Sequence, residues 1–227
     1  MEEVSFKIIV ADPSHKIYST QITEEMESSA KARGTGIAKR SPAYIETKME
    51  EGKAVIALTT DGRWAGFCYI EAWGHGKYVA NSGLIVSPEF RKYGLARKIK
   101  QEIFKLSRKK YPDSKIFGLT TGAAVMKINS ELGYIPVSYA DLTDDEEFWK
   151  GCQSCVNYDI LMSKNRQNCI CTAMLYDPQA KKNHTEELAL RDDFKKELKL
   201  FDRWVRLKKY VMLKLTKSKD SVKSIFL

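Results

Sequence analysis

The stretch from Ser82 to Lys110 constrains the fold most, because an apolar run leads there through a short basic turn into a helix. "SGLIV" has the composition of a buried strand, and the pattern from Leu95 to Tyr111 predicts a helix that ends before Pro112. The turn between them holds one glycine, Gly94, among the basic residues Arg91, Lys92 and Arg97. A strand that leads directly into a helix favours a domain that mixes strands and helices.

The basic turn itself predicts a phosphate site. Exposed amides at a helix start, helped by the helix dipole, bind phosphate groups. Gly94 allows the backbone to come close to a ligand, and the small Ala96 leaves room in the next turn. A solvated basic turn is the alternative interpretation of this stretch taken alone.

The remaining elements are predicted in the order β-α-α-β-β-β-α-β-α-β. Residues 4–12 form a strand in this prediction, 17–33 a helix, and 42–51 a second helix. Three strands follow in "AVIALTT", "WAGFCYIEAW" and "YVANSGLIV". After the long helix come a strand in "SKIFGLTT", a helix in "AAVMKINSEL" and a last strand in "YIPVSYADL". Early hairpins and a later crossover helix predict an α/β (α+β) fold, a mixed central sheet with helices on both faces.

Composition and charge limit the class of protein. The chain has 227 residues, 43% hydrophobic and 11% aromatic, which is enough for a packed core. Its net charge of +9 permits nucleic acid, a membrane surface or a small polyanion as partner. There is no run of about 18 apolar residues, and "MEEVSFKIIV" lacks the basic region of a secretory signal. We therefore expect a cytoplasmic protein without a membrane span.

The segment from Val86 to Ala96 resembles the coenzyme-A-binding segment of the GNAT N-acyltransferase superfamily. That segment has the form Arg/Gln-x-x-Gly-x-Gly/Ala, which is matched here by Arg91, Gly94 and Ala96. Downstream, "AVMKINSELGY" is similar to the helix that follows in the family, with its Leu-Gly-aromatic ending at Leu132, Gly133 and Tyr134. The resemblance covers roughly residues 4–142. It implies a GNAT fold and an acyl-CoA-dependent N-acyltransferase.

The resemblance also implies how the co-substrate, acetyl-CoA or another short-chain acyl-CoA, is held. Loop amides bind its pyrophosphate, and its pantetheine arm lies between two splayed parallel strands, here "GLIV" and "IFGLTT". Amides of the first strand polarise the thioester carbonyl as an oxyanion hole. The implied cofactor-binding residues are Leu84, Ile85, Val86, Arg91, Lys92, Tyr93, Gly94, Leu95, Ala96, Arg97, Thr120 and Asn129.

Acyl transfer needs a base for the amine and a proton or dipole for the leaving thiolate. Many family members place a tyrosine as acid four residues before the helix-ending glycine. Asn129 stands at that position here, and it can donate a hydrogen bond but no proton. Tyr134 and Tyr139 are other candidate acids, with a core position as the alternative. Glu71 and His75 are the candidate bases, with a solvent-facing carboxylate and a turn cap as alternatives.

The link "AKARGTGIAKR" predicts the acceptor. In the implied fold it overhangs the acceptor site, and it carries the candidate substrate-binding residues Arg33, Lys39 and Arg40. Arginine binds carboxylates through paired hydrogen bonds, so we expect a small acidic amine; a mobile basic loop is the alternative. With "GFCYIEAWGHGK" and the cysteine segment, this link resembles a bacterial GNAT group associated with arginine biosynthesis. That resemblance implies N-acylation of glutamate, with an acetyl or a succinyl donor.

Residues 144–180 form a cysteine-rich segment after the expected catalytic domain, residues 1–143. Thiolates of four cysteines match the donor set of a structural zinc site: Cys152, Cys155, Cys169 and Cys171. Four reduced cysteines that pack a small subdomain are the alternative. Cys68, in an apolar strand, is expected in the core.

Residues 181–227 form a tail with a helical pattern, an apolar stripe and a basic second half. Docking on the main domain, or on a partner subunit in a homodimer, is favoured over a membrane-surface helix. Two rival functions are an acyltransferase for a polyamine or protein lysine and a non-catalytic GNAT-like module that binds nucleic acid. The basic acceptor link counts against the first rival. The intact phosphate loop counts against the second, so nucleic acid is not expected as a partner.

Overall fold

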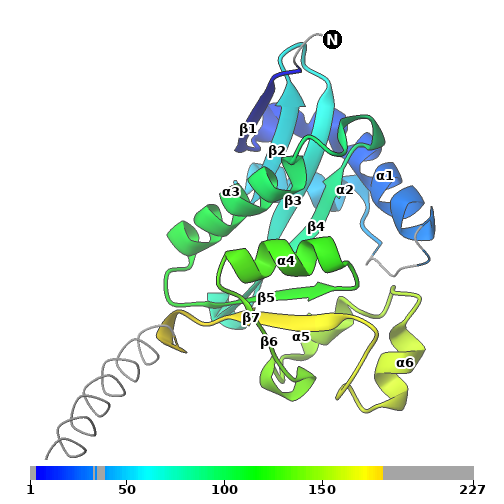
Figure 1. The fold of residues 1–227 in the computed structure, drawn as a ribbon, viewed down its shortest axis with the longest axis vertical. Coiled ribbons are helices and arrows are strands. Elements are labelled where there is room, and N and C mark those ends of the chain that lie inside the picture. The colour runs from blue at the N-terminus through cyan, green and yellow to red at the C-terminus, as the bar shows by residue number, and fades with distance from the viewer. Residues whose placement is uncertain (1–3, 33, 35–38, 181–227) are drawn as a thin grey trace, which may run out of the picture. The chain divides into compact units, whose positions relative to one another are not determined.

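The computed structural model describes residues 4–32, 34 and 39–180, which form a mixed sheet of seven strands in the order β1-β2-β3-β4-β5-β7-β6 (Figure 1). The strands are β1 (Phe6–Val10), β2 (Ala54–Thr59), β3 (Trp64–Trp73), β4 (Tyr78–Val86), β5 (Lys115–Thr120), β6 (Ile135–Pro136) and β7 (Thr172–Tyr176). The helices are α1 (Ser19–Ala32), α2 (Pro42–Glu50), α3 (Leu95–Lys110), α4 (Ala123–Glu131), α5 (Glu146–Lys150) and α6 (Tyr158–Ser163). Within the described residues, β4 and β5 are the only parallel neighbours.

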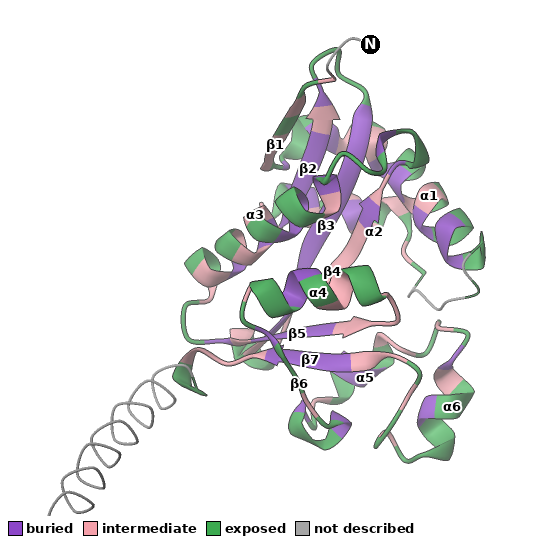
Figure 2. Cartoon of the chain, viewed as in Figure 1, coloured by how far each residue is buried: buried purple, intermediate pink, exposed green. Residues whose placement is uncertain are grey.

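Helices cover both faces of the sheet, as predicted. Helices α3 and α4 lie on one face, and α1 and α2 lie on the other (Figure 1). Alternation along β3 supplies both cores, because Cys68 and Ile70 pack in the α3 cluster while Phe67 and Tyr69 pack in the α1–α2 cluster. Cys68 is fully buried, and β2 and β3 are buried along most of their length (Figure 2). The predicted mixed sheet is therefore confirmed.

Local signals explain where two helices begin. Helix α2 starts at Pro42, and the Ser41 hydroxyl accepts a hydrogen bond from the Tyr44 amide at 3.2 Å. Helix α1 begins later than predicted, at Ser19, because residues 13–18 form a 3₁₀ helix. The Asp12 carboxylate caps that turn by accepting from the Ser14 amide at 2.9 Å.

The predicted last strand, residues 134–142, is wrong in extent, since β6 comprises Ile135 and Pro136 alone. Pro136 has no N–H for a sheet, and the Ser138 hydroxyl caps a 3₁₀ turn over residues 139–141. The neighbour of β5 over five paired positions is instead β7, a strand that the sequence pattern did not predict. It comes from the cysteine segment and lies between β5 and β6.

The cysteine segment shares a core with the rest of the sheet. Phe117 of β5 and Leu175 of β7 pack with Phe148, Trp149 and Leu161 from α5 and α6. One compact unit extends to Pro178, so packing does not divide the chain at residue 143. The predicted tail helix and its docking lie outside the described residues.

Strands β4 and β5 form a fork. They pair over three positions, where Tyr78, Val79 and Ala80 face Lys115, Ile116 and Phe117. The remaining residues of the two strands are not paired with each other. The fork opens toward the β4–α3 loop, because β4 ends there.

A β-bulge in β4 lies beside the fork. Phe67 pairs with Ile85 and Tyr69 with Ser82, so two residues of β4, Gly83 and Leu84, stand opposite one residue of β3. Gly83 has a left-handed backbone with φ of +64°. A Cβ there would overlap the Tyr69 ring and would lie 2.7 Å from the Met26 methyl group. The bulge therefore requires glycine for its backbone and for its packing.

Gly83→Ala is expected to destabilise the fold, because left-handed strain of roughly 1–2 kcal/mol adds to overpacking of roughly 1–3 kcal/mol. Gly62→Ala is the matched control, since Gly62 has a φ of +85° and a Cβ added there would have nothing within 4 Å. Urea unfolding of both variants measures the difference. Equal losses of unfolding free energy would show that the bulge has no packing constraint.

Candidate functional site

The loop between β4 and α3 has the backbone that a phosphate site requires. Gly94 precedes α3 with φ of +73°, and Lys92 is left-handed as well. The Lys98 amide donates to the Gly94 carbonyl at 3.3 Å, so the amides before it have no acceptor inside the helix. A Cβ on Gly94 would have no atom within 4 Å. The loop thus presents backbone donors to open space at the positive end of a 16-residue helix.

Two of the predicted basic residues support this loop through ion pairs. The Arg91 guanidinium donates to Glu25 at 2.9 Å and to the Ser29 hydroxyl at 2.7 Å, which ties the loop to α1. Arg97 pairs with Glu131 at the end of α4. Both arginines therefore fix the elements around the loop, while the exposed Lys92 and Tyr93 lie beside Gly94.

The residues predicted to hold the cofactor arm lie on the two sides of the fork. Leu84, Ile85 and Val86 follow the last β4–β5 pair, and the Leu84 position belongs to the bulge. Thr120 ends β5 on the opposite side, where its hydroxyl accepts from the Gly122 amide at 3.0 Å. The structure therefore brings both predicted strand segments to one opening.

Buried polar side chains gather at the base of the fork, on the α3 face. The Tyr134 hydroxyl donates to the Asn81 Oδ1 at 3.1 Å, and Asn81 Nδ2 donates to the Ser107 hydroxyl at 2.7 Å. Asn129 contacts Met174 Sδ at 3.6 Å through Nδ2, and its Oδ1 is buried without a hydrogen-bond partner. Burial raises the pKa of Tyr134 well above its ordinary value, which makes this hydroxyl a poor acid for a thiolate.

Glu71 lies in a buried ion cluster on the opposite face of the sheet. It is 6% exposed, so the alternative of a solvent-facing carboxylate is wrong. The Lys48 ammonium lies 2.9 Å from its Oε2, and the Arg40 guanidinium lies 3.6 Å from its Oε1. The Tyr44 hydroxyl also donates to Glu71. Two cations therefore surround one carboxylate in this cluster.

The ion cluster is connected to the bulge through Tyr69. Arg40 Nε donates to the Tyr69 hydroxyl at 3.0 Å, and the Tyr69 ring packs against Gly83. Of the other predicted acceptor residues, Lys39 is exposed and pairs with Glu27 at 3.1 Å. Arg33 lies outside the described residues. Lys48, Tyr44 and Tyr69 were missed because no contiguous motif connects α2 with β3.

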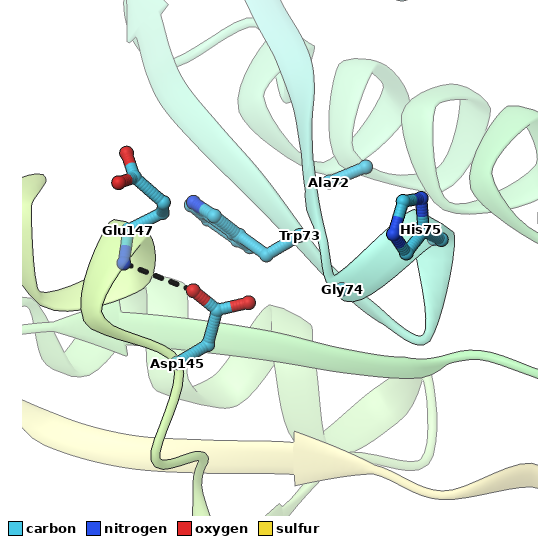
Figure 3. A pocket seen from close by; sticks show the side chains of 7 residues that line it. Ala72, Trp73, Gly74, His75, Asp145 and Glu147 are labelled. Carbon is cyan, nitrogen blue, oxygen red and sulfur yellow. Dashed lines mark hydrogen bonds between the residues drawn. The ribbon is translucent and has the colours of Figure 1, made fainter.

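His75 is not brought to the fork. It lies in an exposed turn between β3 and β4, at the end where β4 and β5 are still paired. Gly83 lies five residue steps along β4 from Tyr78, a distance of roughly 16 Å. His75 lines a different cavity of about 420 Å³, with Trp73, Asp145 and Glu147 around it (Figure 3). The prediction of His75 as a base therefore finds no support in the geometry.

The four cysteines of residues 144–180 line one small cavity of about 30 Å³, together with Tyr139. Burial and the neighbouring thiols raise the pKa of Cys152 to about 11 and that of Cys171 to about 12. Within the described residues, no three His, Cys, Asp or Glu side chains are arranged to hold a metal ion. The predicted zinc site is therefore not supported, and Cys152 and Cys169 pack against the core that α5, α6 and β7 share.

The forked parallel strands, the bulge and the amide-lined helix start lie together around the end of β4. Residues 23–124 match the family model described as the acetyltransferase (GNAT) family. This match covers slightly less than half of the chain, and it shows that these residues are similar to a GNAT acetyltransferase domain. A search of curated protein sequences finds no match.

Solved structures share this fold at low sequence identity. N-acetylglutamate synthase from Neisseria gonorrhoeae, complexed with coenzyme A and N-acetylglutamate, has a TM-score of 0.54 at 16% identity; 78% of this chain covers 36% of that one. A Mycobacterium tuberculosis protein in complex with CoA has a TM-score of 0.54 at 15% identity, covering 75% of this chain and 98% of that one. A Sinorhizobium meliloti phosphinothricin acetyltransferase has a TM-score of 0.50 at 15% identity, covering 77% and 88%.

This chain therefore spans about a third of the length of the Neisseria enzyme. In the part of the chain that the structure describes, no helix is both long and apolar enough to cross a bilayer.

Gly94→Ala is expected to weaken coenzyme A binding at least tenfold, because the added Cβ disfavours the left-handed backbone that aims the loop amides. Gly52→Ala serves as control, since Gly52 also has a left-handed backbone, with φ of +58°, and lies near Lys110 at the opposite end of α3. Titration calorimetry with coenzyme A gives both dissociation constants. Unchanged binding by Gly94→Ala would place the phosphate site elsewhere.

Proposed function

We propose that this protein transfers a short acyl group from coenzyme A to the amino group of a small acidic acceptor, with glutamate as the best candidate. The observation that supports an acidic acceptor is the buried cluster of Glu71 with Arg40 and Lys48 beside the bulge. Its two cations exceed its one carboxylate, so it is suited to a further anionic group. Acetyl and succinyl donors both fit the proposal.

In the proposed reaction, the acceptor amine attacks the thioester carbonyl directly. Backbone amides of Leu84 in the bulge and of Ile85 and Val86 after it stabilise the oxyanion. Arg40 and Lys48 bind the carboxylate of the acceptor. Glu71 is the proposed base, acting through water, since it is the one carboxylate among the buried residues of the described chain.

The same cluster argues against a polyamine or a protein lysine as acceptor. A cationic acceptor next to Arg40 and Lys48 would raise the electrostatic energy of the complex, and no second buried carboxylate among the described residues offsets it. Acidic acceptors relieve this repulsion. With glutamate as the acceptor, the proposed role of the enzyme is in amino-acid biosynthesis, in the cytoplasm.

The test of this function is a thiol-release assay with acetyl-CoA and succinyl-CoA against glutamate, ornithine, spermidine and a lysine peptide. Release with glutamate alone is the expected outcome, and the preferred donor identifies the acyl group. Release only with spermidine or the peptide would contradict the acidic acceptor and leave the enzyme class in place. Salt-dependent binding of random DNA without thiol release would favour the non-catalytic rival.

Arg40→Gln is expected to raise the KM for the acidic acceptor about tenfold to hundredfold, since a charged hydrogen bond contributes roughly 1.5–3 kcal/mol. The KM for the acyl-CoA should stay unchanged. Lys39→Gln is the control, because it removes the same charge from the adjacent, exposed position. Steady-state kinetics with both substrates varied measure these constants. Equal effects of the two variants would mean that the overall charge of the link matters and that Arg40 makes no specific contact.

A further inference from the structure

Lys100 of α3 is a buried cation that has no role in the reaction proposed above. It is 2% exposed, and it is the one lysine among the buried residues of the described chain. A buried ammonium is costly unless an anion compensates it. Across the described residues, no carboxylate lies within ion-pair distance of Lys100. Its ammonium instead lies over the Tyr134 ring, 5.4 Å from the centroid.

The position of Lys100 on α3 places it at the fork. Lys100, Phe104 and Ser107 are spaced four and three residues apart and therefore lie on one face of the helix. Ser107 contacts Asn81, the first residue of β4 beyond the pairs with β5. Lys100 lies two turns, about 10 Å, nearer the phosphate loop on that same face. It is therefore located between the base of the fork and the loop at the start of α3.

Neighbouring side chains place the ammonium opposite the bulge. Tyr134, whose ring it covers, donates to Asn81, while Cys68 of β3 is close enough to interact electrostatically with Lys100. Cys68 donates to the Ser82 carbonyl at 3.3 Å and stands opposite Gly83 and Leu84. The contacts of Lys100 therefore lie on both sides of the β4 segment that borders the fork.

The other candidate acids at the fork have little capacity to give a proton. Asn129 has no dissociable proton at useful pH. The Tyr134 proton is donated to Asn81, and burial raises the pKa of that hydroxyl. The leaving thiolate thus lacks an acid among the residues that the family pattern implies. Separately, the buried Oδ1 of Asn129 has no hydrogen-bond partner and could accept a hydrogen bond from a ligand.

We propose that Lys100 is the acid of acyl transfer, its ammonium donating a hydrogen bond to the thioester sulfur and then a proton as coenzyme A leaves. The amine nitrogen bonds to the carbonyl carbon and loses its proton to the base. The carbon–sulfur bond then breaks, its electron pair goes to sulfur, and the Lys100 proton follows. Lys100 regains a proton from solvent. This inference rests on the proposed function for its use of an acyl-CoA, and it does not depend on which amine accepts the acyl group.

The acidity of Lys100 suits this role. Burial lowers the pKa of Lys100 to about 8, close to the value of about 8.5 for a thiol. Lys100 therefore holds its proton at neutral pH and can transfer it without a large energetic cost. The titratable groups that face it are Cys68 from β3 and Tyr134 after α4, with Tyr176 of β7 beyond the Tyr134 ring. None of these is a carboxylate.

The first test uses coenzyme A alone and needs no acceptor. Thiolate absorbance reports the pKa of the bound coenzyme A thiol, with Lys100→Met compared with wild type. We expect the bound thiol to titrate about one pH unit or more below free coenzyme A in wild type, and without this lowering in Lys100→Met. Lys105→Met, an exposed position on the same helix, is the control and should behave as wild type. The same thiol pKa in all three proteins would overturn the proposal.

The second test is kinetic and uses whichever amine the panel identifies. Lys100→Met should lower kcat roughly a hundredfold or more, the usual contribution of general acid catalysis, and change the dissociation constant for coenzyme A less than about threefold. The wild-type kcat should fall above pH 8 as Lys100 deprotonates, and this fall should be absent from the variant. A kcat within about threefold of wild type would contradict the proposal.

Unfolding temperatures separate catalysis from folding. The folded pKa of Lys100 lies below its unfolded value, so burial destabilises the protein fully below pH 8 and ceases to do so above about pH 10.5. Lys100→Met should therefore melt higher than wild type at pH 7, with a difference that shrinks toward pH 10.5. A variant that melts lower at pH 7 would show that Lys100 stabilises the fold, and it would overturn the proposal.

The failure of the proposed acceptor can be told apart from the failure of this inference. A lowered thiol pKa in wild type, in a protein that does not acylate an acidic amine, would contradict the acidic acceptor and leave the role of Lys100 in place.

Discussion

The parting of β4 and β5 is the constraint on which the rest of the structure depends. Parallel strands normally continue pairing, because unpaired backbone groups in the interior are costly. Here the pairs end after Ala80 and Phe117. The bulge at Gly83 and Leu84 turns backbone groups of β4 away from the ladder with β3. The fork therefore leaves backbone donors for a ligand in the middle of an otherwise buried sheet.

The fork also separates two chemical environments across one strand. On the α3 face, a cationic Lys100 and the hydroxyl of Tyr134 lie beside β4. On the opposite face, Arg40 and Lys48 surround Glu71, and Tyr69 connects Arg40 to Gly83. If a thioester lies in the fork, its leaving sulfur would contact residues of the α3 face, and the attacking amine would approach from the opposite face. This division is what the proposed reaction requires of an acid and an acceptor site.

The phosphate loop could be predicted from the sequence because its parts are contiguous. Gly94, the helix start at Leu95 and the preceding strand are neighbours in the chain, so one contiguous stretch of sequence was enough to predict all three. Strand β7 could not be predicted in this way, since its pairing with β5 spans more than fifty residues. The partners of Glu71 and the setting of Lys100 were missed for the same reason. A strand carboxylate and a helix lysine look solvated until the packing of distant elements is known.

The buried charge of Lys100 is easier to explain by function than by folding. Folding alone would favour an apolar residue at position 100, because a desolvated ammonium without an anion lowers stability. The α3 helix has such residues at Ile99 and Ile103, which pack in the core beside Lys100. Retaining the charge there costs stability in the ligand-free protein. In the proposed reaction a negative charge develops on the departing thiolate. A buried ammonium beside it would stabilise that charge, which offsets the loss of stability in the ligand-free protein.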